Sequence, residues 1–214
     1  MRPPFAGPTS PLESTVMVQP SILVLSSSPS STSKTARVAE HILHQLEGPL
    51  ATVRHIRLRD LPPAALLRAD ASDPQIAEAV AAVEQASGIV IATPIYKAAY
   101  SGLLKVFLDL LPQFALAGKI VLPCATGGSL AHVLALDYGL RPVLQSMGAR
   151  HIVQSQFVLE PHLKIEGDSL SVDDVTGATL LEAIYHFRCA LGHAPPHDQL
   201  GHPRPERADG TASG

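Results

Sequence analysis

The stretch GIVIATPIYKAAYSGLLKVFLDLLP, from Gly88 to Pro112, decides the fold. It opens with the apolar run Gly88 to Ala92, which is typical of a central strand buried on both faces of a parallel sheet. Pro94 is expected to end this strand, because proline cannot donate to a ladder. A loop with two tyrosines then leads into an apolar helix from Gly102 to Pro112. A strand, a polar loop and a helix in this order predict a ligand site at the carboxyl end of the strand.

Strand and helix patterns alternate along the rest of the chain. Further strands are expected at 21–25, 51–58, 119–125 and 151–158, and further helices at 33–46, 76–86, 130–147 and 175–191. The strand at 51–58 alternates polar and apolar residues, which suits the edge of a sheet. Five strand–helix units without an early glycine fingerprint predict an α/β fold. The expected architecture is a doubly wound, five-stranded parallel sheet with helices on both faces, in the flavodoxin-like strand order.

The composition narrows the class of protein. The chain has 214 residues, 46% of them hydrophobic, with a net charge of −3, and this is enough for one domain with a sizeable core. A nearly neutral chain without a run of basic residues argues against nucleic acid as a partner. No apolar run is long enough for a membrane span. Cys124 and Cys189 fall in a predicted strand and helix, and are expected to be buried thiols of a cytoplasmic protein.

Both ends of the chain differ from its middle. Residues 1–19 are expected to be a disordered extension, and residues 194–214, rich in proline, glycine and charge, a disordered tail. The domain is then 20–193. The extension has no apolar segment of the kind found in a secretory signal, and translation could start at Met1 or at Met17. The histidines of the tail have no fixed ligand spacing, so no metal site is predicted.

The loop after the first strand reads SSSPSSTSKT, residues 26–35. It is rich in hydroxyl groups, contains Lys34 and leads into the start of a helix. Backbone N–H groups and the dipole at a helix start bind phosphate. An ordinary serine-rich cap of the helix is an equally open interpretation. Neither GxGxxG nor GxxxxGK[ST] is present, so neither a dinucleotide fold nor a nucleotide-hydrolysing P-loop is supported.

A second loop, ATGGSLAH at 125–132, follows a neighbouring strand. At Thr126, Gly127 and Gly128 the backbone can approach a flat ligand closely, because two of these residues lack a Cβ. Residues 93–96 lie one strand away, so two stretches of main chain could hold one planar ring. A tight structural turn is the alternative for the two glycines.

Two segments, TPIYKAAYSGLLK (93–105) and LPCATGGSLAHVLALDYGLRPVL (122–144), closely resemble the NAD(P)H-dependent FMN reductases of alkanesulfonate monooxygenase systems, the SsuE type. The resemblance covers roughly residues 22–157. It implies a homo-oligomer, a dimer of dimers, that transfers hydride from NADPH to FMN. It further implies that reduced FMN (FMNH2) is released to a separate alkanesulfonate monooxygenase.

The resemblance also assigns site residues by position. The FMN phosphate would be held by Ser28, Ser33, Lys34 and Thr35, and the isoalloxazine ring would be framed by Pro94, Ile95, Tyr96, Thr126, Gly127, Gly128 and Ser129. In the family the first loop usually reads like GSPR. Here Ser27 takes the place of the glycine and Ser30 that of the arginine, so a bidentate phosphate donor is missing from the loop.

Tyr138 matches the other signature of the family. In relatives an inserted tyrosine makes a π-bulge at a tetramer interface, close to the flavin of a neighbouring subunit. The residues themselves show that Gly139 and Pro142 disfavour a regular helix there, and an interface tyrosine beside a proline kink is the alternative. Tyr96 and Tyr138 are therefore the catalytic candidates. Lys97 and Tyr100, with Tyr96, are expected to shape the place where nicotinamide stacks.

The predicted function is that of an enzyme whose cofactor carries out the chemistry. Hydride transfer needs stacking and close contact rather than an acid and a base, which agrees with the lack of a convincing His, Asp and Glu cluster. A quinone or azo reductase with permanently bound FMN is the second interpretation. A flavodoxin-type electron carrier ranks third, because such carriers tend to be strongly acidic.

Overall fold

The computed structural model describes residues 19–49, 51–167 and 169–192. The strands are β1 (Ser21–Ser26), β2 (Thr52–Arg57), β3 (Gly88–Tyr96), β4 (Ala99–Tyr100), β5 (Ile120–Gly127), β6 (His151–Ile152), β7 (Gln156–Leu159), β8 (Leu163–Glu166) and β9 (Ser169–Val172). The helices are α1 (Lys34–Leu46), α2 (Pro63–Leu67), α3 (Pro74–Gln85), α4 (Gly102–Leu108), α5 (Arg141–Ser146) and α6 (Asp174–Gly192). Apart from Gln19, whose side chain donates to the Pro49 carbonyl at 2.8 Å, the extension and tail predicted from the sequence lie outside the described residues.

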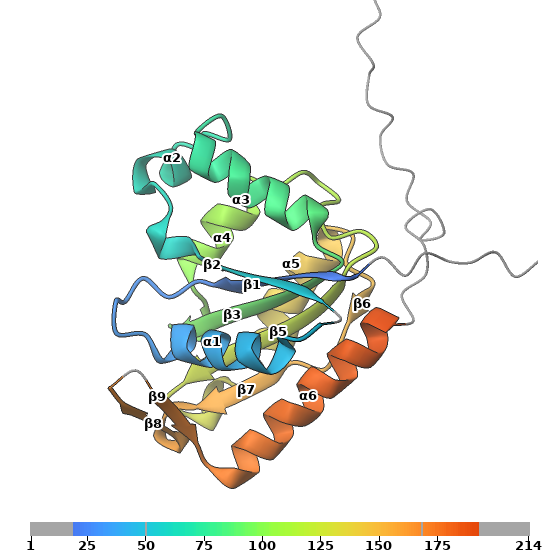
Figure 1. Ribbon diagram of the computed structural model, residues 1–214. Coiled ribbons are helices and arrows are strands. Elements are labelled where there is room, and N and C mark those ends of the chain that lie inside the picture. Colours follow the sequence, from blue (N-terminus) through green and yellow to red (C-terminus); the bar gives the residue numbers. More distant parts are fainter. Residues whose placement is uncertain (1–18, 50, 168, 193–214) are drawn as a thin grey trace, which may run out of the picture.

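The strands form a sheet in the order β2-β1-β3-β5-β6, and these neighbours are all parallel. This is the flavodoxin-like order, so the predicted fold class is confirmed. The strand β7 also pairs with β5, and the short β4 turns back antiparallel on β3. In Figure 1, α1 and α6 cover one face of the sheet, and α3, α4 and α5 cover the other.

Neighbouring residues on each central strand pack on opposite faces of the sheet. Ile89 and Val121 belong to the cluster under α3, α4 and α5, whereas Val90 and Leu122 belong to the cluster under α1 and α6. All four side chains are fully buried. This explains the continuous apolar runs in the sequence, because a parallel strand covered on both faces has no polar side. Each fully buried aliphatic side chain contributes roughly 1.5–3 kcal/mol as an upper estimate.

The expectation that Pro94 ends its strand is wrong. β3 continues to Tyr96, and its ladder with β5 extends to the pair Pro94 and Thr126. The carbonyl of Ala92 faces β1, where it accepts from the Ser27 N–H at 3.0 Å. Backbone groups alternate along a strand, so the nitrogen of Pro94 faces the same side, beyond the last β1 pair at Ala92. The missing N–H therefore costs no ladder bond.

The strand predicted at 151–158 is divided into β6 and β7. The side chain of Arg141 donates to the carbonyl oxygens of Ile152 and Val153, both at 3.2 Å, where the strand is interrupted. The β8–β9 hairpin and α2 are additions that the sequence patterns did not predict. Likewise, the helix predicted at 130–147 begins with a 3-10 turn, Leu130–His132, and becomes α-helical only at Arg141.

The two cysteines differ from each other. Cys124 is buried in β5 as expected, and burial raises the pKa of its thiol to about 12. Cys189 is exposed, so the expectation that it is buried is wrong. It lies two residues after the buried Phe187 on α6, which is about 200° further around the helix and so on the outer face. Among the described residues, no helix is both long enough and apolar enough to cross a membrane.

Candidate functional site

The loop that follows β1 is fixed to the end of β3. Ser27 is fully buried, and its hydroxyl donates to the Ala92 carbonyl at 3.2 Å. The Ser101 hydroxyl, at the start of α4, lies 2.8 Å from the Ser27 carbonyl oxygen and 3.0 Å from the Ser27 hydroxyl. Ser27 stands where the first loop of the resembled family has glycine. Its hydroxyl therefore adds a buried polar link between the first loop and the β3 segment.

Ser33 caps α1, because its side chain accepts from the Ala36 N–H at 3.1 Å. The capping interpretation of this loop is thus confirmed for Ser33. This capping bond still leaves N–H groups at the helix start for an anion. The first i→i−4 bond of the helix runs from the Arg37 N–H to the Ser33 carbonyl, so the N–H groups of Lys34 and Thr35 lie outside the helical ladder. Ser28 and Thr35 are buried beside this start, and the Ser28 hydroxyl accepts from the Ser30 N–H.

Lys34 extends from the helix start toward the turn after β7. Its Nζ donates to the Glu160 carbonyl at 3.1 Å and lies 3.6 Å from the carboxylate of the same residue. The lysine is about one third exposed. As the first residue of α1, Lys34 is close to the predicted phosphate position. Part of its positive charge is offset by the carboxylate of Glu160.

The start of α1 and the end of β5 are joined by two threonines. The hydroxyl oxygens of Thr35 and Thr126 lie 2.6 Å apart, and both residues are buried. The two positions are 91 residues apart in the sequence. The structure thus places the predicted phosphate loop and the predicted ring-binding loop side by side at the carboxyl edge of the sheet.

The two glycines at the end of β5 differ in their surroundings. A Cβ on Gly127 would lie 2.7 Å from the Phe157 ring, so the ring would have to shift to admit any side chain there. A Cβ on Gly128 would have no atom within 4 Å, and no unusual φ demands glycine at that position. The backbone at Gly128 therefore faces open space, as a cradle for a flat ligand would.

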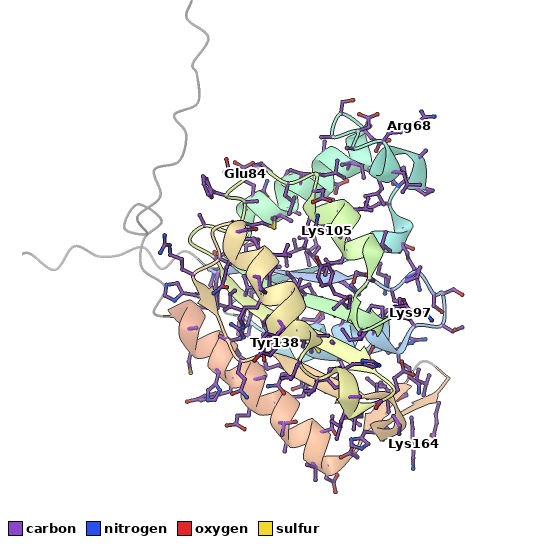
Figure 2. All side chains as sticks on the ribbon, turned by 180° about the vertical axis from the view of Figure 1, so that it is seen from behind. Arg68, Glu84, Lys97, Lys105, Tyr138 and Lys164 are labelled. Atoms are coloured by element: carbon purple, nitrogen blue, oxygen red, sulfur yellow. The ribbon has the colours of Figure 1, made fainter. Side chains whose placement is uncertain are left out.

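The segment after β3 is a tight hairpin. Lys97 and Ala98 both have positive φ values, 51° and 62°, which are costly for residues with a Cβ. The hairpin exposes the Tyr96 side chain to 49%, whereas Tyr100 is partly buried. Figure 2 shows Lys97 at the tip of β3, where this hairpin turns. Positive φ at both central residues is the geometry of a two-residue hairpin turn, and non-glycine residues held in it are found clustered at functional sites.

Tyr138 lies in a π-helical segment, Leu136–Leu140, so the predicted bulge is present. The Arg141 N–H donates to the Leu136 carbonyl, five residues back, as a π-helix requires. The tyrosine is 79% exposed on the side of the molecule that carries α5, as Figure 2 shows. A Cβ on Gly139 would lie 3.9 Å from the Tyr100 ring. The π-helical segment therefore packs against the hairpin.

The π-helical segment is held by a polar network. Arg141 Nε contacts Asp137 Oδ1 at 3.1 Å, and Nη2 donates to the Ser155 hydroxyl at 3.1 Å. Ser155 in turn donates to Asp137 at 3.0 Å. These bonds tie both ends of the segment to the interruption between β6 and β7, and so fix the backbone on either side of Tyr138.

Two polar residues from the β2 side approach the first loop and were not identified from the sequence. His55 Nε2 lies 2.9 Å from the Ser26 hydroxyl. Burial, followed by the positive charge of Arg57, lowers the pKa of His55 to about 4, so the imidazole is neutral at pH 7. Arg59 donates to the Ser30 carbonyl. The predicted strand order was the available signal, because it places the end of β2 beside the end of β1.

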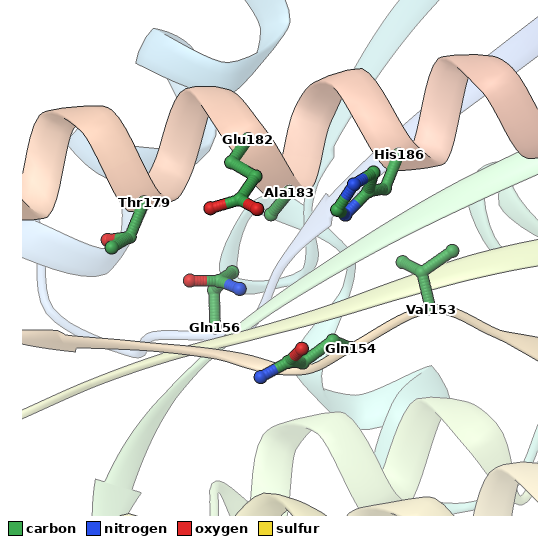
Figure 3. Close-up of a pocket in the computed structure, with 7 residues that line it drawn as sticks. All are labelled: Val153, Gln154, Gln156, Thr179, Glu182, Ala183 and His186. Carbon is green, nitrogen blue, oxygen red and sulfur yellow. The ribbon is translucent and has the colours of Figure 1, made fainter.

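A hollow of about 150 Å³ lies elsewhere, between α6 and the chain from Val153 to Gln156. Figure 3 shows Thr179, Glu182 and His186 on the helix facing Gln154 and Gln156 on the strand side. None of the site residues predicted from the sequence lines it. Within the described ranges, no group of three or more potential ligands could hold a metal ion.

The chain is similar to several known proteins. The family described as "NADPH-dependent FMN reductase" matches residues 20–163. The FMN reductase (NADPH) of Escherichia coli strain K12 is 43% identical over 136 residues, which are 64% of this chain and 71% of that protein. The protein of the same name from Pseudomonas putida KT2440 is also 43% identical over 136 residues, covering 64% of this chain and 69% of that protein.

A solved structure is also similar. The apo crystal structure of an NADH:FMN oxidoreductase (EMOB) is 56% identical in sequence, with a TM-score of 0.78, and the match covers 87% of this chain and 97% of that chain. These findings confirm the predicted class, an oxidoreductase that uses FMN and NAD(P)H. Since the family match extends over well more than half of the sequence, the chain belongs to the NADPH-dependent FMN reductase family.

Proposed function

We propose that this protein reduces FMN with NADPH and releases the reduced FMN to a separate monooxygenase that desulfonates alkanesulfonates. The observation that carries the proposal is the contact between Thr35 and Thr126, which brings a helix start and an open glycine backbone to one edge of the sheet. One ligand with a phosphate at one end and a flat ring at the other would span both.

The residues at this edge fit FMN. The phosphate would lie at the start of α1, where the N–H groups of Lys34 and Thr35 are outside the helical ladder and Ser28 and Ser33 add hydroxyl groups. The ring would lie against the backbone from Thr126 to Ser129, where a Cβ at Gly128 would meet nothing else, with Pro94, Ile95 and Tyr96 along its other side. When bound, FMN supplies the acceptor for a hydride from nicotinamide.

The protein contributes binding and orientation rather than proton transfer. Tyr96 is half exposed beside the strained turn at Lys97, and Tyr100 packs beneath the π-helical segment. We assign these three residues to the place where nicotinamide stacks on the flavin ring. Close parallel stacking brings the two reacting atoms together, and such orientation alone accounts for large rate gains.

A homo-oligomer, specifically a dimer of dimers, forms part of the proposal. Apolar side chains are exposed on the segment from the 3-10 turn to the π-helix: Leu130, Val133, Leu134 and Tyr138. Apolar groups that gather on a surface in this way favour burial against a partner. If a second copy of the chain packed there, Tyr138 of one subunit would lie close to the flavin site of the other. This arrangement would favour a flavin that leaves after reduction.

The test is an absorbance spectrum of the purified protein, followed by NADPH oxidation with and without added FMN. A colourless protein that oxidises NADPH only when FMN is added supports the proposal. Flavin that stays bound through quinone turnover would instead indicate a quinone reductase, and bound flavin without NADPH oxidation would indicate an electron carrier. Repeating the assay with NADH gives the nucleotide preference.

A further inference from the structure

A cation from the turn after β2 reaches the loop that follows β1. Arg59 lies in the 3-10 turn Leu58–Asp60, directly after β2. Its Nη1 donates to the carbonyl oxygen of Ser30, and its Nε lies 3.4 Å from Asp60 Oδ1. The side chain is only 24% exposed, so it lies against the protein rather than extending into water. The guanidinium is thus held beside the loop at 26–35.

The cation within the loop is less available than the sequence suggests. Lys34 donates to the Glu160 carbonyl at 3.1 Å and lies 3.6 Å from the Glu160 carboxylate. Both contacts draw the amine toward the turn after β7. A carboxylate at this distance offsets part of the attraction that a lysine would offer to an anion.

Arg59 has donors to spare. A guanidinium carries several N–H groups in a planar fork that suits phosphate, and the contacts with Asp60 and Ser30 engage one at Nε and one at Nη1. The carboxylate of Asp60 is 63% exposed, so water screens its pairing with the arginine. The arginine can therefore keep its bond to the loop and still donate to an anion.

We propose that Arg59 binds the phosphate of FMN and supplies the guanidinium that the loop itself lacks at Ser30. The Ser30 hydroxyl is occupied locally, since it accepts from the Thr32 N–H at 3.2 Å, and it carries no charge. Arg59 reaches the same residue from outside the loop. The inference rests on the proposed function, because it requires that the phosphate lies at the start of α1.

A purely structural role for Arg59 predicts different results. In that case the arginine only ties the loop to β2 through the Ser30 carbonyl. Arg59→Gln keeps an N–H donor for that carbonyl but removes the charge, and Arg59→Lys keeps the charge but removes the fork. Arg54→Gln is the matched control, since Arg54 lies on β2, the strand that precedes the turn of Arg59, and is half exposed and paired with Glu78 at 2.6 Å.

The experiment measures dissociation constants for FMN and for riboflavin, which has no phosphate, at low and moderate salt. Arg59→Gln should raise the constant for FMN about tenfold, or about 1.4 kcal/mol, leave that for riboflavin unchanged, and weaken the salt dependence of FMN binding. Arg59→Lys should recover part of the loss, and Arg54→Gln should bind both flavins like the parent protein.

Two results would overturn the inference: unchanged FMN affinity in Arg59→Gln, or an equal loss of affinity for both flavins. Either would leave Arg59 as a tie between the loop and β2. Failure of the proposed function would be seen in the parent protein itself, as FMN bound no better than riboflavin and no NADPH oxidation with added FMN.

Discussion

The hydroxyl oxygens of Thr35 and Thr126 lie 2.6 Å apart in the protein interior and share a hydrogen bond. Thr35 is in the first turn of α1, and Thr126 is near the end of β5. This bond connects the loop expected to hold a phosphate with the loop expected to hold a ring. The bond therefore helps to fix the distance between these two segments of the chain.

The threonine pair should show strong energetic coupling. Thr126→Val leaves the Thr35 hydroxyl buried without its partner, and should lower the free energy of unfolding by about 1–3 kcal/mol. The double variant Thr35→Val/Thr126→Val should lose less than the sum of the two single variants, because no unpaired hydroxyl remains. Urea unfolding of all four proteins measures the coupling. Strictly additive losses would mean that the hydroxyls do not interact.

The two glycines should respond differently to added side chains. Gly128→Val should weaken FMN binding by more than tenfold, which is about 1.4 kcal/mol or more, with little change in thermal stability, because no protein atom lies near its Cβ. Gly127→Ala should instead cost about 1–3 kcal/mol of stability through overlap with Phe157. Flavin titration and thermal melts separate the effects. An unchanged FMN affinity in Gly128→Val would show that the flavin ring does not bind against this loop.

Stability should fall on mild acidification, partly through His55. Its pKa is lowered to about 4 by burial and by Arg57, whereas in the unfolded chain it is about 6.5. Between these values the unfolded chain binds a proton that the folded chain does not, so the free energy of unfolding decreases as the pH falls from 6.5 toward 4.

His55→Gln should reduce this acid sensitivity. Urea midpoints at pH 7 and pH 5 give the measurement, and His44→Gln, at an exposed position on α1, controls for the simple loss of an imidazole. An equally steep decline in the His55→Gln variant would show that His55 is not the group responsible.

Tyr138 should decide whether flavin is released. Deleting this residue removes the extra position from Leu136–Leu140 and should restore a regular helix. We expect the deletion variant to keep FMN through purification, whereas Tyr138→Ala, which retains the insertion, should change less. Flavin content and NADPH oxidation with excess FMN are measured for each. A colourless deletion variant that oxidises NADPH at the parent rate would limit Tyr138 to an interface role.

The strands of the sheet could be predicted from the sequence because each is marked by residues that are neighbours in the chain. Apolar runs such as Gly88 to Ala92 mark buried strands, and the glycine and hydroxyl-rich loops mark the strand ends. Interactions between distant residues were not predictable. Arg141 binds the carbonyl oxygens at the interruption between β6 and β7, and the continuation of β3 through Pro94 depends on where β1 ends.

For the candidate site, too, only the features that depend on neighbouring residues could be predicted from the sequence. The loops themselves could be found from residue types, but the Thr35 and Thr126 bond, the pairing of Lys34 with Glu160 and the approach of Arg59 need the folded backbone. The two glycines look equivalent in sequence, and only the position of Phe157 distinguishes them.

The most direct measurement is a crystal structure of the protein with FMN. We predict that the phosphate lies at the start of α1, within hydrogen-bond distance of the Thr35 N–H, and that the ring lies against the backbone at Gly128. FMN bound elsewhere, for example in the hollow between α6 and the chain at Gln154 and Gln156, would contradict it.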